Sequence, residues 1–450
     1  MDPRSTRKSA TFGDDHGRPN DGTRASAHAE EAPRRINDVE YVSSDEALDM
    51  LSIKKESLYT YVSRGLIRTT KHKDGRRRRY LKSDVEKLRT RSPGHLEKPH
   101  VSHTLRYGEP IVQTWISEIT NQGPRYRGHL ATRLVTDLRS FEVVAELLWT
   151  GVLNPREVVW PLQVIPADIS VHTAARQAQS PNINPLAWLT LLTHLISTSP
   201  LLEASTRAHD PVSTGIQLIQ TFCGAAGLIG PKRTYLPPNE GETVAACIAR
   251  GLGRERDSEV IRILDAALVL SAENELAAPT FAARICASTG ADLYACVASA
   301  LQVQSGPMQV GGTFDVEIML EALTRARGRP ESRLAGYSRG GLPCFNHPLY
   351  ERDPRAAALL ALVASLERPQ GGTPAVLDFI VSTERSSGQY PNIFAALVVA
   401  TRALGLPSGT AAFLHTVGRT SGWLAHAVEQ RLTGTMLRPR AKYMGAKSSD

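Results

Sequence analysis

The chain of 450 residues is long enough for one small domain and one large one, and hydrophobic residues make up 41% of it. No apolar run approaches the roughly 20 residues of a membrane helix, and the polar N-terminus lacks the apolar centre of a signal peptide. The five cysteines form no close pair with metal-ligand spacing, which predicts a reduced, cytoplasmic protein with free thiols and no metal site.

The net charge of +8 is concentrated in one segment of the chain. Between Arg64 and Arg91 there are 12 basic and 3 acidic residues, a balance of +9, so the rest of the chain is close to neutral. Such local positive charge is the electrostatic footprint of a site for a polyanion.

The first ordered elements follow a polar tail. Residues 1–38 have almost no periodic apolar positions and are predicted to be disordered. Ser43–Glu46 has the Ser-x-x-Glu form of a capping box and predicts a short helix. A second helix is predicted over about 55–64, with Leu58 and Val62 facing inward.

A basic loop, a strand at Arg79–Leu81 and a third helix opened by Ser83–Glu86 follow. Helix, turn, helix, basic hairpin and helix are the order of a winged helix-turn-helix domain, which we predict over 39–92. The second helix would present polar side chains to a DNA groove, and the wing would contact phosphate or the minor groove. The predicted DNA-binding residues are Lys54, Lys55, Ser57, Tyr59, Thr60, Ser63, Arg64, Arg76, Arg77, Arg78 and Arg79.

The segment Ser57–Arg68, with the Arg-Arg-Arg-Tyr sequence that ends at Tyr80, is similar to small DNA-binding domains of the MerR and excisionase type. That resemblance implies binding to duplex DNA, whereas the alternative is a solvated basic face on an accessory domain. Contacts to phosphate make the affinity for DNA fall steeply as the salt concentration rises, so the salt dependence of binding distinguishes the two alternatives. Residues 93–109 contain proline, glycine and histidine and are predicted to be a linker.

From Ile111 onward the chain alternates apolar stretches with proline and glycine breaks, without the strand–helix alternation of a doubly wound sheet. Phe141–Trp149 predicts an amphipathic helix. Val260–Leu270, Ala356–Leu366 and Phe394–Leu404 are apolar on all sides and predict buried core helices. With short strands near 111–119, the predicted fold class is mainly α.

A glycine-rich turn lies within Leu301–Met319. A helix is predicted to end near Gln304, because Gly306 and Pro307 break it, and Gly311–Gly312 would let the chain turn before a second helix. One interpretation is that such a turn exposes peptide N–H groups to a ligand. The alternative is that it only connects two helices.

This turn and the preceding Thr280–Tyr294 resemble the citrate synthase family, in which a similar helix leads into a Gly-Pro-Leu-His-Gly-Gly-Ala loop. The resemblance covers about residues 110–445, followed by a tail at 446–450. It implies an almost wholly helical subunit with a large and a small domain that works as a homodimer. Its other blocks are Trp115–Ile119, Tyr126–Gly128, Ser140–Gly151, Leu342–Arg355, Leu414–Gln430 and Leu437–Arg440.

The family condenses acetyl-CoA with oxaloacetate to form citrate. A carboxylate removes a methyl proton, a loop histidine donates to the enolate, another histidine polarises the ketone, and arginines bind the carboxylates. The resemblance places His347 at the ketone-polarising position. It places Arg355, Arg419 and Arg438 at the carboxylate-binding positions, the last reaching in from a partner subunit. No cofactor is implied beyond acetyl-CoA as a co-substrate.

Three catalytic positions depart from the family pattern. Gln309 replaces the loop histidine, Asn274 replaces the histidine of an Asp-His-Glu turn, and Phe394 replaces the catalytic carboxylate. A glutamine amide can still donate a hydrogen bond, but a phenyl ring does no acid–base work. Loss of a positioned base removes about 10² to 10⁴ in rate. Glycines of the turns on the CoA side are replaced by Val310, Cys344 and Asn346.

The remaining histidines lack such context, and we expect His129, His415 and His426 to be packing or surface residues. Taken alone, His347 would be a packed core histidine and Arg419, Arg438 and Arg440 would be ion-paired or solvated. The sequence blocks around His347 and Arg419 favour ligand contact instead.

Three function classes follow from these features. The favoured class is a protein that binds an oxaloacetate-type dicarboxylate, with citrate formation reduced or lost, fused to a DNA-binding head as a metabolite-responsive regulator. The alternative is an active citrate synthase or acyl-CoA condensing enzyme with a substitute base such as Asp315 or Glu317. The third is a structural dimerisation body for the DNA-binding head.

Overall fold

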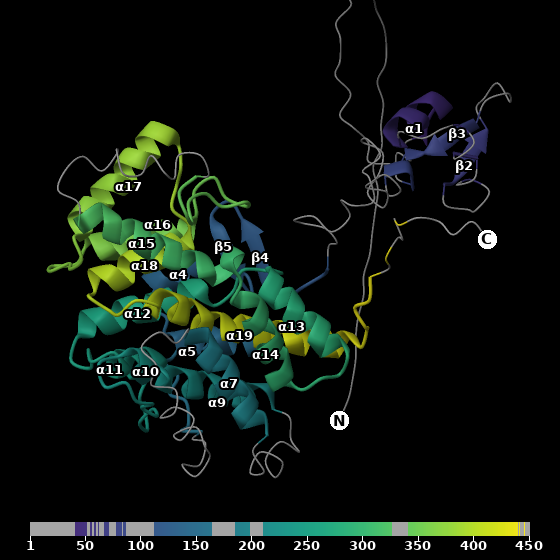
Figure 1. Ribbon diagram of the computed structural model, residues 1–450. Coiled ribbons are helices and arrows are strands. Elements are labelled where there is room, and N and C mark those ends of the chain that lie inside the picture. The colour runs from purple at the N-terminus through teal and green to yellow at the C-terminus, as the bar shows by residue number, and fades with distance from the viewer. Residues whose placement is uncertain are drawn as a thin grey trace, which may run out of the picture. The chain divides into compact units, whose positions relative to one another are not determined.

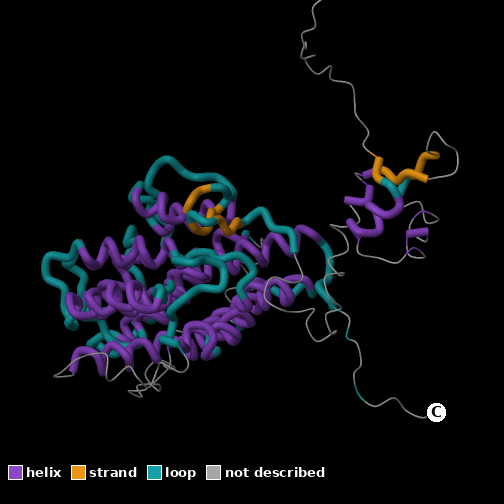
Figure 2. The backbone as a smooth tube through the Cα atoms, turned by 90° about the horizontal axis from the view of Figure 1, so that it is seen from above, coloured by secondary structure: helices purple, strands orange, loops and turns teal. Residues whose placement is uncertain are grey.

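The computed structural model describes parts of 41–86 and then 112–163, 185–198, 210–325 and 341–439, with two single residues beyond. The chain divides into two compact units between Ile111 and Val112. Helices predominate, and strands occur in two small sheets (Figures 1 and 2). The tails predicted at 1–38 and 446–450 and the linker predicted at 93–109 lie outside the described residues.

The N-terminal unit begins its first helix, α1 (Ser44–Leu51), at the predicted capping box. The Ser43 N–H donates to Glu46 Oε2 at 2.7 Å, and the Glu46 N–H donates to Ser43 Oγ at 3.2 Å. Strand β3 (Arg78–Leu81) lies between β1 (Tyr41–Val42) and β2 (Thr69–Lys71) in an antiparallel sheet. The small core consists of Val42, Ala47, Leu51, Leu58, Ile67, Tyr80 and Val85.

The second unit is built around one long helix, α19 (Thr410–Thr433), which runs through its middle in Figure 1. Every residue of α19 from Thr410 to Ala427 is buried. Because such a helix must find apolar partners on all sides, other helices surround it. These are α5 (Phe141–Thr150), α7 (Pro185–Ser197), α9 (Pro211–Gly224), α12 (Ser258–Ser271), α13 (Ala278–Ser288), α14 (Leu293–Gln304) and α18 (Ile393–Ala403).

The other elements of this unit cover or connect that assembly. Most of the helices that follow a loop begin at a serine, threonine, aspartate or asparagine whose side chain accepts a backbone N–H. The remaining elements are β4 (Ser117–Thr120), β5 (Gly123–Tyr126), β6 (His129–Leu130), α4 (Ala131–Thr136), α10 (Ala226–Ile229), α11 (Val244–Gly251), a π-helical turn (Pro307–Gly311), α15 (Gly312–Arg325), α16 (Pro354–Ala364) and α17 (Thr373–Ser387).

Two expectations about apolar helices are corrected. Helix α16 buries one face, with Leu359 and Val363 inside, whereas Ala357 and Ala361 are exposed, because small alanines are tolerated on either side. The segment Pro211–Ile229 does have the length and composition of a membrane span, but 67% of it is buried. It packs against α11 and α19 as a core segment of the helical body.

Two glycines let α12 approach α19 closely. A Cβ on Gly418 would lie 2.7 Å from the Leu268 carbonyl oxygen, and one on Gly422 would lie 2.6 Å from the Ala272 carbonyl oxygen. Side chains at these positions would push the helix end away, so the contact requires glycine. The close approach brings the C-terminal carbonyls of α12 beside the polar side chains of α19.

A pair of buried carboxylates, Asp265 in the middle of α12 and Glu142 at the start of α5, accepts backbone N–H groups of neighbouring helices. Asp265 accepts the Phe141 N–H at 3.0 Å, and Glu142 accepts the Val244 N–H at 2.7 Å. Burial, and then the neighbouring Glu142, raise the pKa of Asp265 to about 7. Burial also raises the pKa of Glu142.

We expect Asp265→Asn to stabilise the protein at alkaline pH. A folded-state pKa raised from 3.8 to about 7 means that stability falls as pH rises through this window. The full rise corresponds to about 4 kcal/mol at 1.36 kcal/mol per pKa unit. The melting temperature of Asp265→Asn should exceed that of wild type above neutral pH and should differ little from it near pH 4. An equal increase at both pH values would contradict the raised pKa of Asp265.

Candidate functional site

The first turn of α16 holds a buried arginine. Asp353 caps this helix and accepts the Arg355 backbone N–H at 3.1 Å, Arg355 Nε at 3.0 Å and Nη2 at 2.9 Å. The same carboxylate accepts the Ile393 N–H at 3.0 Å, which fixes it against α18. Although burial opposes both charges, the pair holds the pKa of Asp353 below and that of Arg355 above the usual range.

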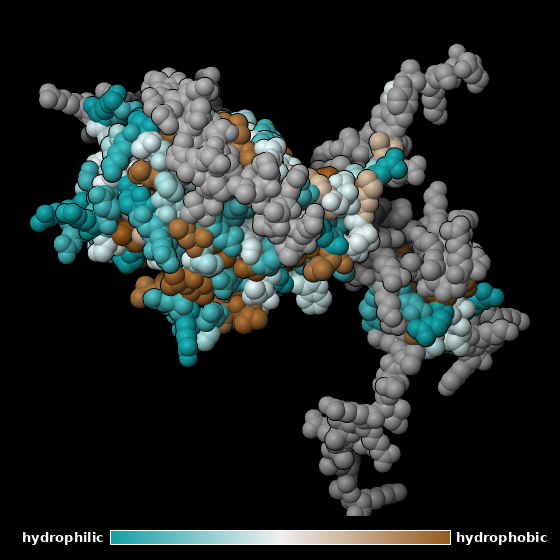
Figure 3. Space-filling model, turned by 90° about the horizontal axis from the view of Figure 1, so that it is seen from below, coloured by the Kyte–Doolittle hydropathy of each residue, from teal (hydrophilic) through white to brown (hydrophobic). Residues whose placement is uncertain are grey.

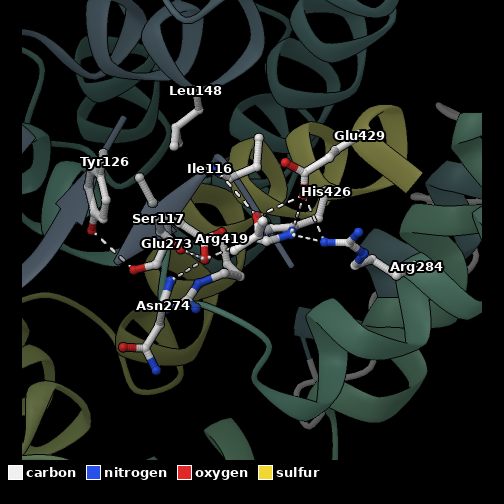
Figure 4. A network of polar contacts seen from close by, with 12 residues as sticks. Ile116, Ser117, Tyr126, Leu148, Glu273, Asn274, Arg284, Arg419, His426 and Glu429 are labelled. Atoms are coloured by element: carbon white, nitrogen blue, oxygen red, sulfur yellow. Dashed lines mark hydrogen bonds and ion pairs between the residues drawn. The ribbon is translucent and has the colours of Figure 1, made fainter. Parts of the chain in front are cut away.

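The other edge of this guanidinium points to the turn after α12. Arg355 Nη1 donates to Asn274 Oδ1 at 2.9 Å, so the structure brings two predicted site residues together. The Asn274 N–H donates to the buried Glu273 carboxylate at 2.8 Å. The Tyr126 hydroxyl points toward this turn and donates to the Glu273 carbonyl at 3.2 Å (Figure 4).

His347 lies beside Arg355 with a defined tautomer. The Leu349 N–H donates to His347 Nδ1 at 3.1 Å, so in the neutral ring Nε2 carries the proton. Burial, and then Arg355, lower the pKa of His347 to about 4, which keeps the ring neutral near pH 7. Arg355 Nη2, 3.4 Å from Nε2, is itself a donor. His347 Nε2–H therefore suits an oxygen acceptor on a ligand.

Arg419 supplies a second buried guanidinium from α19. Its Nε donates to the Ser271 carbonyl at 2.9 Å, at the point where α12 ends. Burial, opposed by Glu273 but reinforced by Arg355, lowers the pKa of Arg419 to about 10. No carboxylate among the described residues lies within ion-pair distance of Arg419, since its neighbour Glu273 is 3.3 Å from His426. Two nearby buried guanidiniums with one directly paired carboxylate form a candidate anion-binding site.

A polar network behind this site joins three parts of the body (Figure 4). His426 lies between Glu273 and Arg284, with Arg284 Nη1 3.3 Å from His426 Nδ1. Arg284 also donates to Glu429 at 2.8 Å, and Glu429 accepts the Trp115 N–H at 2.7 Å. The network therefore connects the turn at Glu273 to the start of the body.

The position of the missing carboxylate lies in apolar packing. Phe394 and Phe314 pack against the buried Leu186, Val310 and Ala412. Gln309 lies in the π-helical turn, with a non-helical backbone at φ −117° and ψ −133°. Neither Gly311 nor Gly312 adopts positive φ. Gly312 permits close contact, since a Cβ there would lie 3.0 Å from Cys344 Sγ.

The two proposed substitute bases have different surroundings. Asp315 is exposed on α15. Glu317 accepts the Gly409 N–H at 2.9 Å and the Ser408 hydroxyl, and so holds the start of α19. Arg438 is exposed in the segment after α19, and no described contact joins it to Arg355 or Arg419.

His415 and His426 are buried, as expected of packing residues, and both also make polar contacts that the sequence analysis did not assign. His415 is only 3% exposed and lies between Gln304, Arg419 and Phe394, in direct contact with two predicted site residues. His426 belongs to the polar network. The spacing of four residues between His415 and Arg419 puts both on one helix face, and this signal could have identified His415.

The predicted DNA-binding residues are described only in part. Lys55 and Tyr59 are exposed on helical positions, and Arg78 and Arg79 are exposed on β3. On the far side of the wing, Arg68 forms an ion pair with Asp84 at 2.8 Å. The remaining positions, Lys54, Ser57, Thr60, Ser63, Arg64, Arg76 and Arg77, lie outside the described residues.

Fold and site together define an almost wholly helical protein with a buried anion-binding site and a small N-terminal domain. The sequence profile of the citrate synthase C-terminal domain matches residues 107–440, and that of a helix-turn-helix domain matches residues 41–92. The chain belongs to the citrate synthase family and carries a helix-turn-helix domain at its N-terminus.

Individual relatives agree with this assignment. A protein named putative citrate synthase 2 from Mycobacterium tuberculosis is 30% identical over 335 residues, which cover 71% of this chain and 86% of the relative. Citrate synthase 2 from Bacillus subtilis is 26% identical and covers 75% of this chain and 95% of its own.

Solved structures show the same fold. Citrate synthase from Thermoplasma acidophilum, solved as a ternary complex with carboxymethyl coenzyme A and oxaloacetate, has a TM-score of 0.62 at 20% identity. The match covers 76% of this chain and 96% of that one. The predicted mainly α, citrate-synthase-like fold is thereby confirmed.

Proposed function

We propose that this protein binds an oxaloacetate-type dicarboxylate, forms citrate slowly or not at all, and binds DNA through its N-terminal domain in response to that ligand. The observation that carries the proposal is the contrast within one site. The anion-binding groups Arg355 and Arg419 and the donor His347 are in place, whereas Phe394 occupies the position of the base.

The binding half rests on complementary chemistry. Two guanidiniums suit two carboxylates, and the neutral imidazole of His347 presents Nε2–H to a ketone oxygen between them. Each charged hydrogen-bond pair contributes about 1.5–3 kcal/mol, which after the entropy lost on association gives micromolar to millimolar affinity.

The loss of condensation rests on the apolar packing around Phe394. A phenyl ring next to Val310 and Phe314 accepts no proton, and an apolar environment also disfavours a hydroxide or a charged base. Gln309 offers a neutral amide where the family has an imidazole. Acyl-CoA is a candidate second ligand because the chain belongs to the citrate synthase family.

The regulatory half rests on the polar network behind the site. The Asn274 side chain accepts from Arg355, and its neighbour Glu273 is linked through His426 to Arg284 and Glu429. Glu429 holds the segment at Trp115, which follows the linker predicted to carry the DNA-binding domain. A ligand that reorganises the Asn274 turn thus has a physical connection to the start of the body.

We also propose that the body forms a homodimer in the cytoplasm. Apolar residues gather in small patches on the face shown in Figure 3. Trp115 and Leu432 are each 83% exposed, and Met436 is 64% exposed close to Arg438 in the sequence. A symmetric partner would cover such side chains and would place Arg438 at a shared site, as the family resemblance implies.

Oxaloacetate binding should be measurable by calorimetry on purified protein. We expect micromolar to millimolar affinity, and a loss of about tenfold or more in Arg355→Lys, because lysine keeps the charge near Asp353 but lacks the bidentate fork. Arg385→Lys, an exposed arginine on α17, is the matched control and should bind normally. Absent heat in wild-type protein would contradict the binding half.

Citrate formation from acetyl-CoA and oxaloacetate should be far slower than about 10 s⁻¹, the ordinary enzyme median. Replacing Phe394→Asp and Gln309→His together should raise the rate, because a carboxylate and an imidazole return to the positions of the base and the enolate donor. Phe394→Asn with Gln309→His is the matched control, since asparagine has similar size but no basicity.

A wild-type turnover near about 10 s⁻¹ would favour the alternative, an active condensing enzyme. Asp315, which is exposed on α15, would then be the first candidate for the substitute base, because Glu317 already accepts from Gly409 and Ser408.

Duplex DNA should bind the full chain at low salt through the basic wing. Replacing Arg76–Arg79 by alanine should weaken binding to every sequence and flatten the salt dependence, because fewer counterions are released. Alanine at the exposed Lys232, Arg233, Arg256 and Arg262 removes the same formal charge from the body and should change little. Gel retardation and sedimentation of the complex measure affinity and the expected dimer. No shift on any duplex at low salt would contradict DNA binding.

A further inference from the structure

Three side chains from two helices form a buried chain of contacts that ends at the anion site. His415 lies one turn before Arg419 on α19 and is 3% exposed. Its Nε2 is 3.3 Å from Arg419 Nη2, and its Nδ1 is 2.7 Å from the Gln304 side-chain amide at the end of α14. The Phe394 ring covers the imidazole at 4.7 Å between centroids.

The contacts allow one arrangement of protons. The guanidinium of Arg419 can only donate, so His415 Nε2 must accept. A neutral imidazole that accepts at Nε2 carries its proton at Nδ1. The atom at 2.7 Å from Nδ1 is Gln304 Nε2, which is a donor, so a proton at Nδ1 requires the amide to be turned by 180°, which puts the Gln304 carbonyl oxygen in this position. Gln304 thereby selects the tautomer of His415 that can hold Arg419.

We propose that His415, oriented by Gln304, is a positioning residue that fixes the Arg419 guanidinium for a ligand carboxylate, and that only neutral His415 can do this. The inference rests on the proposed dicarboxylate binding. Arg419 is held at Nε by the Ser271 carbonyl and at Nη2 by His415. These two anchors fix the plane of the guanidinium and leave Nη1 and the second Nη2 hydrogen for a carboxylate.

Protonation would reverse the contact. A charged imidazole carries a hydrogen at Nε2, so donor would face donor and two positive charges would lie side by side. The charged groups that act on His415 are Arg419 on its own helix and Arg355 on α16, whereas Gln304 and Phe394 are neutral. Burial, followed by Arg419 and Arg355, lowers the pKa of His415 well below its ordinary value. The contact therefore persists through mildly acidic pH.

Calorimetry with oxaloacetate separates positioning from mere packing. We expect His415→Leu to lose about tenfold in affinity, because an apolar side chain cannot accept from Arg419. His415→Gln should restore most of it, since its amide oxygen accepts as Nε2 does. Thermal melting establishes that each variant is folded.

A second variant gives a readout that packing alone would not change. Gln304→Glu puts a carboxylate beside Nδ1, which stabilises the imidazolium and raises the pKa of His415. Wild-type affinity should vary little between about pH 5.5 and 7.5, whereas affinity in Gln304→Glu should fall as pH decreases through this range. In the double variant Gln304→Glu with His415→Gln, the pH dependence should disappear.

The outcomes distinguish the two proposals. If wild-type protein binds no dicarboxylate, the proposed function is wrong and this inference falls with it. If wild-type protein binds but a folded His415→Leu binds equally well, or the pH profile of Gln304→Glu stays flat, only the role of His415 is overturned. If His415→Leu does not fold, the pH dependence of oxaloacetate affinity in Gln304→Glu tests the role of His415 by itself.

Discussion

The close approach of α12 to α19 is the constraint on which the rest of the site depends. Gly418 and Gly422 remove the side chains that would separate the two helices, so the last carbonyls of α12 reach α19 directly. Carbonyls at a helix end have no intrahelical partner and must be satisfied when buried. Arg419 donates to the Ser271 carbonyl, and the Tyr126 hydroxyl lies within hydrogen-bond distance of the carbonyl oxygens of Val269, Leu270 and Glu273.

This arrangement gives one arginine two roles. Arg419 completes the buried end of α12, and the same anchoring presents its remaining N–H groups beside Arg355. The site is therefore preorganised, because the contacts that position the guanidinium are also contacts of the folded core. Arg355 follows the same logic, since its partner Asp353 both caps α16 and ties α18 to it.

The sequence predicts features that are local and misses those that depend on distant partners. Capping at Ser43 and the helix end at Gln304 were predictable, because caps and breaks are set by neighbouring residues. The pairing of His347 with Arg355 lies within one block. The contact of His415 with Arg419 follows from their spacing of four residues on one helix, whereas its contact with Gln304, 111 positions away, was not predictable. In an apolar helix, a histidine by itself resembles a packing residue.

Binding and catalysis separate in this site because they depend on different physical terms. Arg355 and Arg419 act by charge and hydrogen bonding that persist in the ground state, whereas proton abstraction needs a base placed for the transition state. Phe394 removes the base without disturbing the two arginines. Its ring packs against His415, which in turn contacts Arg419. In the proposed function, a single aromatic residue in place of a carboxylate disfavours chemistry, while its contact with His415 supports ligand binding. Recognition of a metabolite without its conversion is the property that the proposed DNA-binding regulator requires.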